Sequence, residues 1–247
     1  MASLTKALAQ RVRPLLYPVL PDYPREVLSR MEGVFPRECC VCGFKGLFKG
    51  FGHPPRYDAL CPNCGSLERH RLLVLCLREY PNAIRSSARL LHFAPEEAVK
   101  RLIEKRVASY KSADIQPGKA DLVLNIEHLD VPDGSFDAII CFDVLEHVDD
   151  RKALAEMFRV LSREGTALLR TPFISNWPTY ENPAVKSPED RLLHFGQEDH
   201  VRYFGGDVRD LIRSAGFSLA DFVAMEPDVS RHGLLRGETI FVASKID

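Results

Sequence analysis

From residue 89 onward, the chain alternates between short apolar runs and segments in which apolar residues recur every three or four positions. Short apolar runs are typical of buried strands, and the wider spacing is typical of amphipathic helices. The strand candidates are residues 89–93, 107–112, 121–124, 136–142, 165–171, 218–224 and 238–244. Strands that alternate with helices predict an α/β fold with a doubly wound, mostly parallel seven-stranded sheet.

Two segments show clear helical spacing, residues 149–164 and residues 206–215. Their apolar positions are Leu154, Met157, Phe158 and Leu161 in the first, and Val208, Leu211, Ile212 and Ala215 in the second. Gly165 and Gly216 follow them, and glycine commonly ends a helix. No helix is evident between the last two strand candidates, so we expect them to form an antiparallel pair at the edge of the sheet.

Residues 172–205 form a long connection with only weak helical spacing. They contain four prolines, two histidines and the only tryptophan of the chain. Such a connection in a compact domain is typical of a lid or a binding loop, and a plain surface insertion is the alternative.

The front of the chain is organised differently. Asp22 can cap a short helix that Gly33 ends, and Ser66 can cap a helix that starts at residue 67. We divide the chain into an N-terminal helical segment (1–34), a cysteine-rich segment (35–66), for which the cysteine spacing below predicts a ribbon, a linking helix (67–88) and an α/β domain (89–247).

Composition and charge restrict the function only broadly. The 247 residues are 45% apolar and 27% charged, with a net charge of −1. No apolar run approaches the roughly 18 residues needed to cross a bilayer, so we predict a cytoplasmic protein without membrane contact. Residues 1–90 hold 14 basic and 7 acidic side chains. The excess of basic residues in this part of the chain has two explanations, which are solvated surface charge and the binding of an anionic partner.

The first residues contain no acid before Asp22. We interpret them as a docked amphipathic helix, and an organellar transit peptide is the alternative.

The seven cysteines indicate a metal site in a reducing compartment. Cys39/Cys42 and Cys61/Cys64 form two copies of Cys-x-x-Cys-Gly, with 18 residues between the pairs. Each pair can direct two thiolates at one ion, so the four predict a structural Zn²⁺ site. Cys40 leaves the choice within the first pair open, and an iron–sulfur cluster is the alternative to zinc.

Between the pairs, basic residues are interleaved with aromatic ones. The residues are Lys45, Lys49 and Arg56 with Phe44, Phe48, Phe51 and Tyr57. The aromatic side chains can form the core of a small ribbon, or the segment can bind nucleic acid.

The run "HLDVPDGSFDAIICFDVLEHVDDRKALAEMFRVLSREGTALLRTPF", from residue 128, resembles the central part of class I S-adenosylmethionine-dependent methyltransferases. The resemblance covers about residues 89–244. The cysteine pairs, "LHFAPE" and "FGQEDHVRYF" are similar to a methyltransferase type 11-like subgroup with an N-terminal four-cysteine zinc ribbon. The resemblance implies a Rossmann-like methyltransferase fold and S-adenosyl-L-methionine as the cofactor.

Cofactor residues follow from the resemblance and from the strand ends. Asp114 comes 22 positions after His92 and can accept both ribose hydroxyls. Asn125 and Ile126 stand where the family contacts adenine, with an amide in place of the usual acid. Phe142 and Asp143 stand where the family lines the cleft.

The first motif departs from the family, because Ala94, Pro95 and Glu96 replace its glycine loop and His92 replaces an acid. We expect Ala94 to shape the turn and Glu96 to pair with the ammonium of the methionine end. An ordinary first-turn helix acid is the alternative for Glu96.

Methyl transfer needs alignment of the reactants and, for a hydroxyl acceptor, removal of a proton. His200 is the candidate general base, because an unperturbed histidine titrates near neutrality. His147 is the second catalytic candidate, although it and Glu146 could equally serve capping and the core. The substrate-binding candidates are Trp177, Tyr180, His194, Gln197 and Arg202.

Three hypotheses follow. The first is a methyltransferase for a hydroxyl or amine of a small-molecule, sugar-like acceptor. The second is an RNA methyltransferase that binds its substrate through the ribbon, although the chain lacks a dense basic run. The third is a zinc-ribbon binding module with a degenerate methyltransferase fold.

Overall fold

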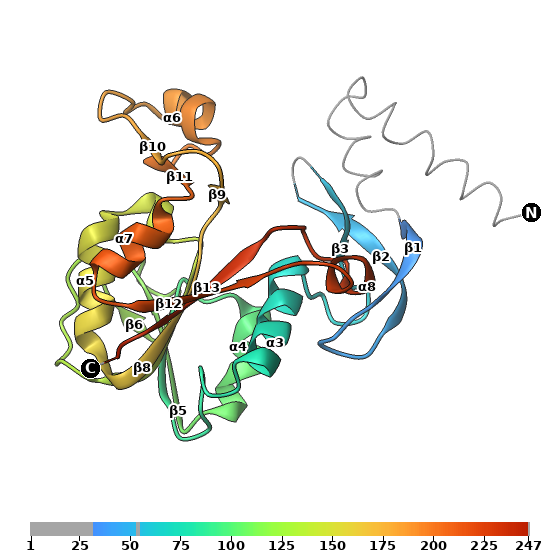
Figure 1. Ribbon diagram of the computed structural model, residues 1–247, viewed down its shortest axis with the longest axis horizontal. Helices are drawn as coiled ribbons and strands as arrows, with labels where there is room; N and C mark the ends of the chain where they lie inside the picture. Colours follow the sequence, from blue (N-terminus) through green and yellow to red (C-terminus); the bar gives the residue numbers. More distant parts are fainter. Residues whose placement is uncertain (1–31, 53–54, 247) are drawn as a thin grey trace, which may run out of the picture. The chain divides into compact units, whose positions relative to one another are not determined.

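The structure is a computed structural model that describes residues 32–52 and 55–246. These residues divide into two compact units, drawn in Figure 1. The ribbon unit extends to Cys76 and includes residues 223–238, and the sheet unit comprises residues 77–222 and the chain from Thr239. The predicted N-terminal helical segment lies, up to residue 31, outside the described residues.

The ribbon unit is built on a three-stranded antiparallel sheet in the order β1-β2-β3. Its strands are β1 (Glu32–Glu38), β2 (Lys45–Phe51) and β3 (Arg56–Leu60). Helix α3 (Glu68–Glu79) starts in this unit, close to the predicted start at residue 67. The short helix α8 (Asp228–His232) also belongs to it, although the predicted boundaries placed residues 223–238 in the α/β domain.

The sheet unit is built on a seven-stranded sheet in the order β12-β13-β8-β7-β4-β5-β6. The strands are β4 (Arg89–Phe93), β5 (Ser109–Asp114), β6 (Leu122–Val123), β7 (Phe136–Phe142), β8 (Leu161–Arg170), β12 (Ser218–Val223) and β13 (Thr239–Ser244). Strands β6, β5, β4, β7 and β8 are parallel, and β13 is antiparallel to β8. The predicted α/β class and the seven-stranded, mostly parallel sheet are confirmed.

Helices cover both faces of this sheet. Helices α5 (Asp150–Val160) and α7 (Val208–Ser214) lie on one face, and α4 (Glu97–Ile103) lies on the other (Figure 1). The core under α5 and α7 contains alternate residues of the central strands, including Leu91, Ile139 and Leu169. Successive residues of a strand point to opposite faces of the sheet. Because helices bury both faces, the central strands are apolar at nearly every position.

One predicted strand start and one predicted connection differ clearly from the structure. Strand β8 begins at Leu161 rather than at residue 165, because α5 ends at Val160 and Leu161 already pairs with Phe136. Helix α8 lies between the last two strands, where no helix was expected. Its five residues are too few for a periodic signal.

The long connection is folded rather than irregular. It contains β9 (Phe173–Ile174), β10 (Tyr180–Glu181), α6 (Pro188–Phe195) and β11 (Arg202–Gly205). The three strands form a small sheet in the order β10-β11-β9. In the chain, this sheet begins three residues after the carboxyl end of β8. Gly205 is needed there, because a Cβ at this position would lie 2.0 Å from the carbonyl oxygen of Trp177. Among the described residues, no helix has the length and apolar character needed to span a bilayer.

Candidate functional site

Three neighbouring strands bring predicted cofactor residues to one edge of the sheet. Strand β4 runs parallel to β5 on one side and to β7 on the other, so their carboxyl ends lie side by side. Ala94 follows β4, Asp114 ends β5 and Asp143 follows β7. A doubly wound sheet binds its ligand at this edge. The fold therefore places these three residues where a ligand would bind.

The turn after β4 has a backbone that usually requires glycine. Ala94 has a φ of +45°, and its N–H donates to the carbonyl oxygen of Ala113 at 2.9 Å. Glu96 stands at the N-cap of α4 in an extended conformation, and its side chain does not cap the helix. The turn thus keeps a glycine-like conformation without a glycine.

Asp114 and Asn125 share a local geometry. Asp114 Oδ1 accepts from the N–H of Gln116 at 2.8 Å, and Asn125 Oδ1 accepts from the N–H of Glu127 at 3.0 Å. These turns hold both side chains beyond their strands. Asn125 is exposed and Ile126 is buried, so of these two predicted adenine contacts the first is on the surface.

His92 lies inside the sheet rather than at its edge. Its side chain is 1% exposed, and its Nδ1 is 2.8 Å from the hydroxyl of Tyr110 on β5. Burial lowers the pKa of His92 to about 4, partly opposed by the charge of Glu96. The ring is therefore neutral near pH 7 and joins two strands.

Asp143 is also held in a left-handed conformation, with a φ of +54°. Its N–H donates to the carbonyl oxygen of Arg170 at 2.8 Å, and its carboxylate forms an ion pair with the Arg170 side chain. Phe142 precedes it and is 5% exposed. Arg170 ends β8, the other neighbour of β7, and the strand-end rule could have identified it from the sequence.

The two predicted catalytic histidines lie close together in space, and Glu146 belongs to the same cluster. Glu146 and His147 lie on the 3₁₀ helix η3 (Leu145–His147), and His200 lies just before β11. One ligand-type atom from each of the three side chains lies within 4.8 Å of the others. The two imidazole rings are perpendicular, with centroids 4.7 Å apart.

Burial sets the electrostatics of this cluster. Glu146 is 2% exposed. Its burial, and to a smaller extent the negative charge of Asp143, raise its pKa to about 7. Burial, followed by the neighbouring His147, lowers the pKa of His200. Thr171, the residue after β8, donates its hydroxyl proton to Glu146 at 2.9 Å. The sequence offered no periodic signal for Thr171 or for the placement of Glu146.

Arg202 is a positioning residue in this structure. It is 5% exposed and donates to the carbonyl oxygens of Leu145, at 2.9 Å, and Val148. It also forms ion pairs with Asp150 and Glu181, both at 3.3 Å. These contacts fix η3 and the start of α5 relative to β11.

The other substrate candidates lie on the surface of the small sheet and α6. Trp177 is 67% exposed. Tyr180 is stacked on His194, with its hydroxyl 2.7 Å from Nδ1 of that ring. Gln197 donates to Asp199 Oδ1 at 3.2 Å. The structure therefore gathers aromatic and polar groups on the predicted binding loop.

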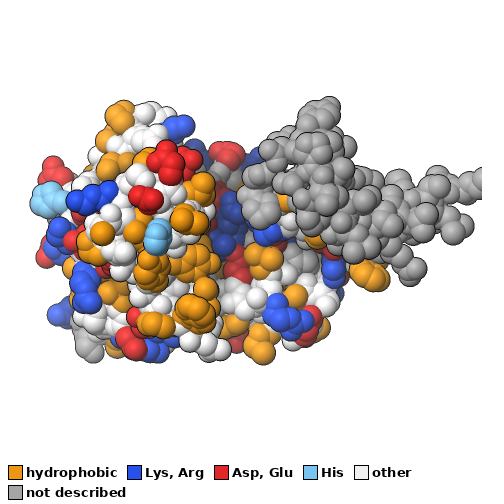
Figure 2. Space-filling view, turned by 90° about the horizontal axis from the view of Figure 1, so that it is seen from above, with side chains coloured by type: hydrophobic (Ala, Val, Ile, Leu, Met, Phe, Trp, Pro, Cys, Tyr) orange, Lys and Arg blue, Asp and Glu red, His pale blue; other side chains and the backbone are white. Residues whose placement is uncertain are grey.

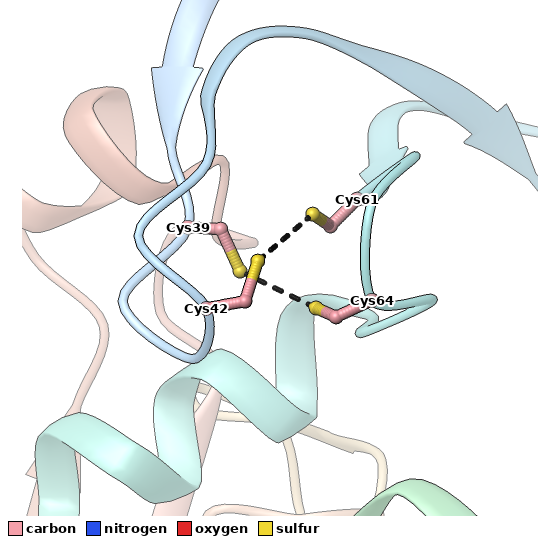
Figure 3. Close-up of side chains that lie close together, drawn as sticks. All are labelled: Cys39, Cys42, Cys61 and Cys64. Atoms are coloured by element: carbon pink, nitrogen blue, oxygen red, sulfur yellow. Dashed lines mark hydrogen bonds between the residues drawn. The ribbon is translucent and has the colours of Figure 1, made fainter.

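A second cluster consists of the four predicted metal cysteines (Figure 3). The Sγ atoms of Cys39 and Cys64 are 3.7 Å apart, and those of Cys42 and Cys61 are 3.8 Å apart. All four sulfur atoms lie within 4.8 Å of one another. Cys40 is outside this group, with its thiol directed at the carbonyl oxygen of Arg71 at 3.4 Å.

The two cysteine turns are built alike. The N–H of Gly43 donates to the carbonyl oxygen of Cys39 at 2.8 Å, and the N–H of Gly65 donates to the carbonyl oxygen of Cys61 at 3.0 Å. The two glycines have φ values of +76° and +71°. Two matched turns that converge four thiols fit a tetrahedral four-thiolate metal site.

Part of the chain is similar in sequence to known methyltransferases. Residues 83–169, from before β4 almost to the end of β8, match the methyltransferase domain family. A protein of Mycolicibacterium smegmatis, named a probable S-adenosylmethionine-dependent methyltransferase, is 31% identical over 116 residues. The match covers 46% of this chain and 38% of that relative, so the chain spans well under two thirds of its length.

Two solved structures share the fold. An S-adenosylmethionine-dependent methyltransferase from Mesorhizobium loti has a TM-score of 0.50 at 15% identity, covering 70% of this chain and 97% of that one. The cyclase SpnF has a TM-score of 0.51 at 12% identity, covering 73% of this chain and 83% of that one. The sheet unit thus has a Rossmann-like methyltransferase fold, and its central segment matches the methyltransferase domain family.

Proposed function

We propose that this protein is an S-adenosylmethionine-dependent methyltransferase that methylates a hydroxyl or amine of a small, sugar-like acceptor. One observation supports the methyltransferase part of the proposal most directly. The segment that matches the methyltransferase domain family is the one that places Ala94, Asp114 and Asp143 at the carboxyl edge of adjacent parallel strands.

In this proposal, the residues at the edge of the sheet bind different parts of the cofactor. The cofactor supplies an electrophilic methyl group. Asp114 accepts hydrogen bonds from the ribose hydroxyls, and Asn125 and Ile126 lie on the adenine side. Glu96, beyond the left-handed turn at Ala94, pairs with the ammonium of the methionine end. Phe142 and Asp143 line the cleft near the reacting methyl group.

The acceptor would bind against the small sheet and α6. Trp177 and Tyr180 are exposed at 67% and 42%, and His194 stacks on Tyr180. Aromatic faces beside polar groups suit the apolar face and hydroxyls of a sugar-like ring. Gln197 would bind the acceptor directly, whereas Arg202 would act by fixing the loop. The roles of His200 and His147 in proton removal remain predictions.

The cysteine cluster would hold one structural Zn²⁺. Four sulfur ligands leave no open coordination position, so this ion would stabilise the ribbon without taking part in the reaction. The matched turns at Gly43 and Gly65 support this role.

Calorimetric titration with S-adenosyl-L-methionine tests the proposal. The wild-type protein should bind one equivalent, and Asp114→Ala should weaken binding at least tenfold because two charge-assisted hydrogen bonds are lost. Glu96→Gln should weaken binding by a similar factor. Glu97→Gln, at the next position and exposed, is the matched control and should bind as the wild type does.

Absence of binding by folded, metal-loaded protein would contradict the enzyme proposal and leave a non-catalytic binding module. If the cofactor binds, salt-dependent association with RNA would favour the RNA methyltransferase alternative. Figure 2 gives that alternative little support, because basic and acidic side chains are interspersed on the described surface of the face shown.

A further inference from the structure

We propose that Glu146, His147 and His200 bind one divalent transition-metal ion, at a site separate from the four cysteines. The three side chains converge from two segments that are more than fifty residues apart in the sequence. They offer three ligand atoms within 4.8 Å of one another. Ligands about 2.1 Å from one ion are at most about 4.2 Å apart, so binding requires only a small inward movement of these side chains.

The partners of the two rings leave the same nitrogen available in each. His200 Nδ1 is 3.1 Å from the carbonyl oxygen of Phe195. His147 Nδ1 is 3.4 Å from the carbonyl oxygen of Asp199 and 3.4 Å from its carboxylate. A histidine that donates its Nδ1 proton in this way presents the lone pair of Nε2, which is the usual arrangement around a metal-binding histidine.

The carboxylate is held in the same manner. Thr171 donates its hydroxyl proton to Oε2 of Glu146, which fixes the carboxylate beside the rings. Glu146 and His200 are 2% and 7% exposed, so the site lies below the surface. The nearby cation Arg170 is paired with Asp143.

The ligand set defines the class of ion. Two imidazoles and one carboxylate suit Mn²⁺, Fe²⁺, Co²⁺ or Zn²⁺, whereas Ca²⁺ and Mg²⁺ prefer oxygen ligands alone. Three protein ligands leave coordination positions open, unlike the closed four-thiolate site. This ion would lie beyond β7, beside Asp143 at the ligand-binding edge of the sheet.

The open positions suggest what the ion does, and this part rests on the proposed methyltransferase function. An acceptor hydroxyl that coordinates the ion would be oriented toward the methyl group and would lose its proton more readily, here to solvent water, because both histidines would be bound to the ion. The acceptor oxygen would then form a bond to the methyl carbon as the carbon–sulfur bond breaks, and S-adenosylhomocysteine would leave as a neutral thioether. The ion would therefore select acceptors that offer an oxygen ligand over those that offer only an apolar face.

The experiment titrates Mn²⁺ into the full-length protein loaded with a single equivalent of Zn²⁺, which the four thiolates take up and which leaves the second site free. Free Mn²⁺ is followed by electron paramagnetic resonance. Mn²⁺ binds thiolate sites more weakly than Zn²⁺ does, so it should not displace the zinc. The wild-type protein should take up one equivalent. His200→Ala and Glu146→Gln should each weaken uptake by more than tenfold.

Two further variants separate metal binding from general damage. His128→Ala removes an exposed histidine outside the cluster and should bind Mn²⁺ as the wild type does. Thr171→Val keeps the shape of the side chain but removes the hydroxyl, and should weaken Mn²⁺ binding roughly 10- to 100-fold, as expected when an outer partner of a ligand is lost.

No uptake by the wild type, or equal uptake by His200→Ala, would overturn the proposal. Calorimetry with S-adenosyl-L-methionine on the same samples distinguishes this failure from failure of the proposed function. A protein that binds the cofactor but no Mn²⁺ contradicts only the metal site. A protein that binds Mn²⁺ but no cofactor contradicts only the methyltransferase.

Discussion

At the residue scale, two of the four non-glycine residues with a positive φ in the described chain lie at the ligand-binding edge, and the other two, Asp58 and Glu164, lie elsewhere. Ala94 and Asp143 both have positive φ values, and they follow the adjacent strands β4 and β7. An L-residue in this conformation costs roughly 1–2 kcal/mol, and such residues cluster at functional sites because the surrounding structure must hold them. The two hydrogen bonds from their N–H groups to neighbouring strands provide that constraint.

The strain at Ala94 predicts an unusual response to substitution. Ala94→Gly relieves the left-handed conformation but makes the unfolded chain more flexible, so it should leave the free energy of unfolding unchanged or raise it by up to about 1 kcal/mol. Ala98→Gly, in helix α4, is the control and should lower it by about 1 kcal/mol. Urea unfolding measures both. Equal destabilisation by the two changes would show that Ala94 is not strained.

At the element scale, the burial of His92 in strand β4 makes the stability of the sheet sensitive to pH. Burial lowers the pKa of His92 to about 4 in the folded protein, whereas an unfolded chain has a histidine pKa near 6.5. Between these values the unfolded state binds more protons than the folded state. Stability due to His92 is therefore fully present above about pH 6.5 and decreases as the pH falls toward 4.

This difference predicts a measurable slope. The His92 contribution should fall by up to about 1.4 kcal/mol per pH unit between pH 6.5 and 4. His92→Gln should flatten the pH dependence of the free energy of unfolding in this range. His128→Gln controls for loss of an exposed histidine. Parallel curves for wild type and His92→Gln, measured by urea unfolding, would rule out this role of His92.

The loop elements show what local pattern can and cannot predict. Residues 172–205 lack periodicity because β9 and β10 have two residues each and β11 has four. These short strands are held in place by contacts with residues that are distant in the sequence. Thr179 donates to Asp207 at 2.7 Å, and Arg202 connects β11 to η3 and α5.

At the scale of the whole molecule, the ribbon unit is assembled from distant segments. The Arg71 side chain is fully buried and donates to four carbonyl oxygens at 2.7–2.9 Å. Two of these belong to Ser66 and Ala59 in the ribbon, and two to His232 and Gly233 in the segment between β12 and β13. The ribbon and residues 223–238 should therefore lose their structure together.

Zinc removal tests this coupling. In small metal-bound units, binding energy is folding energy. Removing zinc with a chelator should abolish amide hydrogen-exchange protection in residues 35–76 and also in residues 223–238. Protection in β4 and β7 should persist, because they belong to the other unit. Persistent protection of residues 223–238 in zinc-free protein would contradict the coupling, and restored zinc should restore protection.

By itself, the sequence determined the features that depend on local spacing. Apolar periodicity predicted the seven-stranded sheet, and the repeated Cys-x-x-Cys-Gly pattern identified four sulfur atoms that do lie together. Strand ends also located Asp114 and Asp143, because parallel strands bring their carboxyl ends to one edge.

Tertiary structure alone decided what depends on contacts between distant segments. It placed His92 inside the sheet, buried Arg202 as a positioning residue and excluded Cys40 from the sulfur cluster. It brought His200 to Glu146 and His147, and it joined residues 223–238 to the ribbon. Side-chain burial and long-range pairing leave no periodic trace in a single sequence, since they are fixed only when the elements pack.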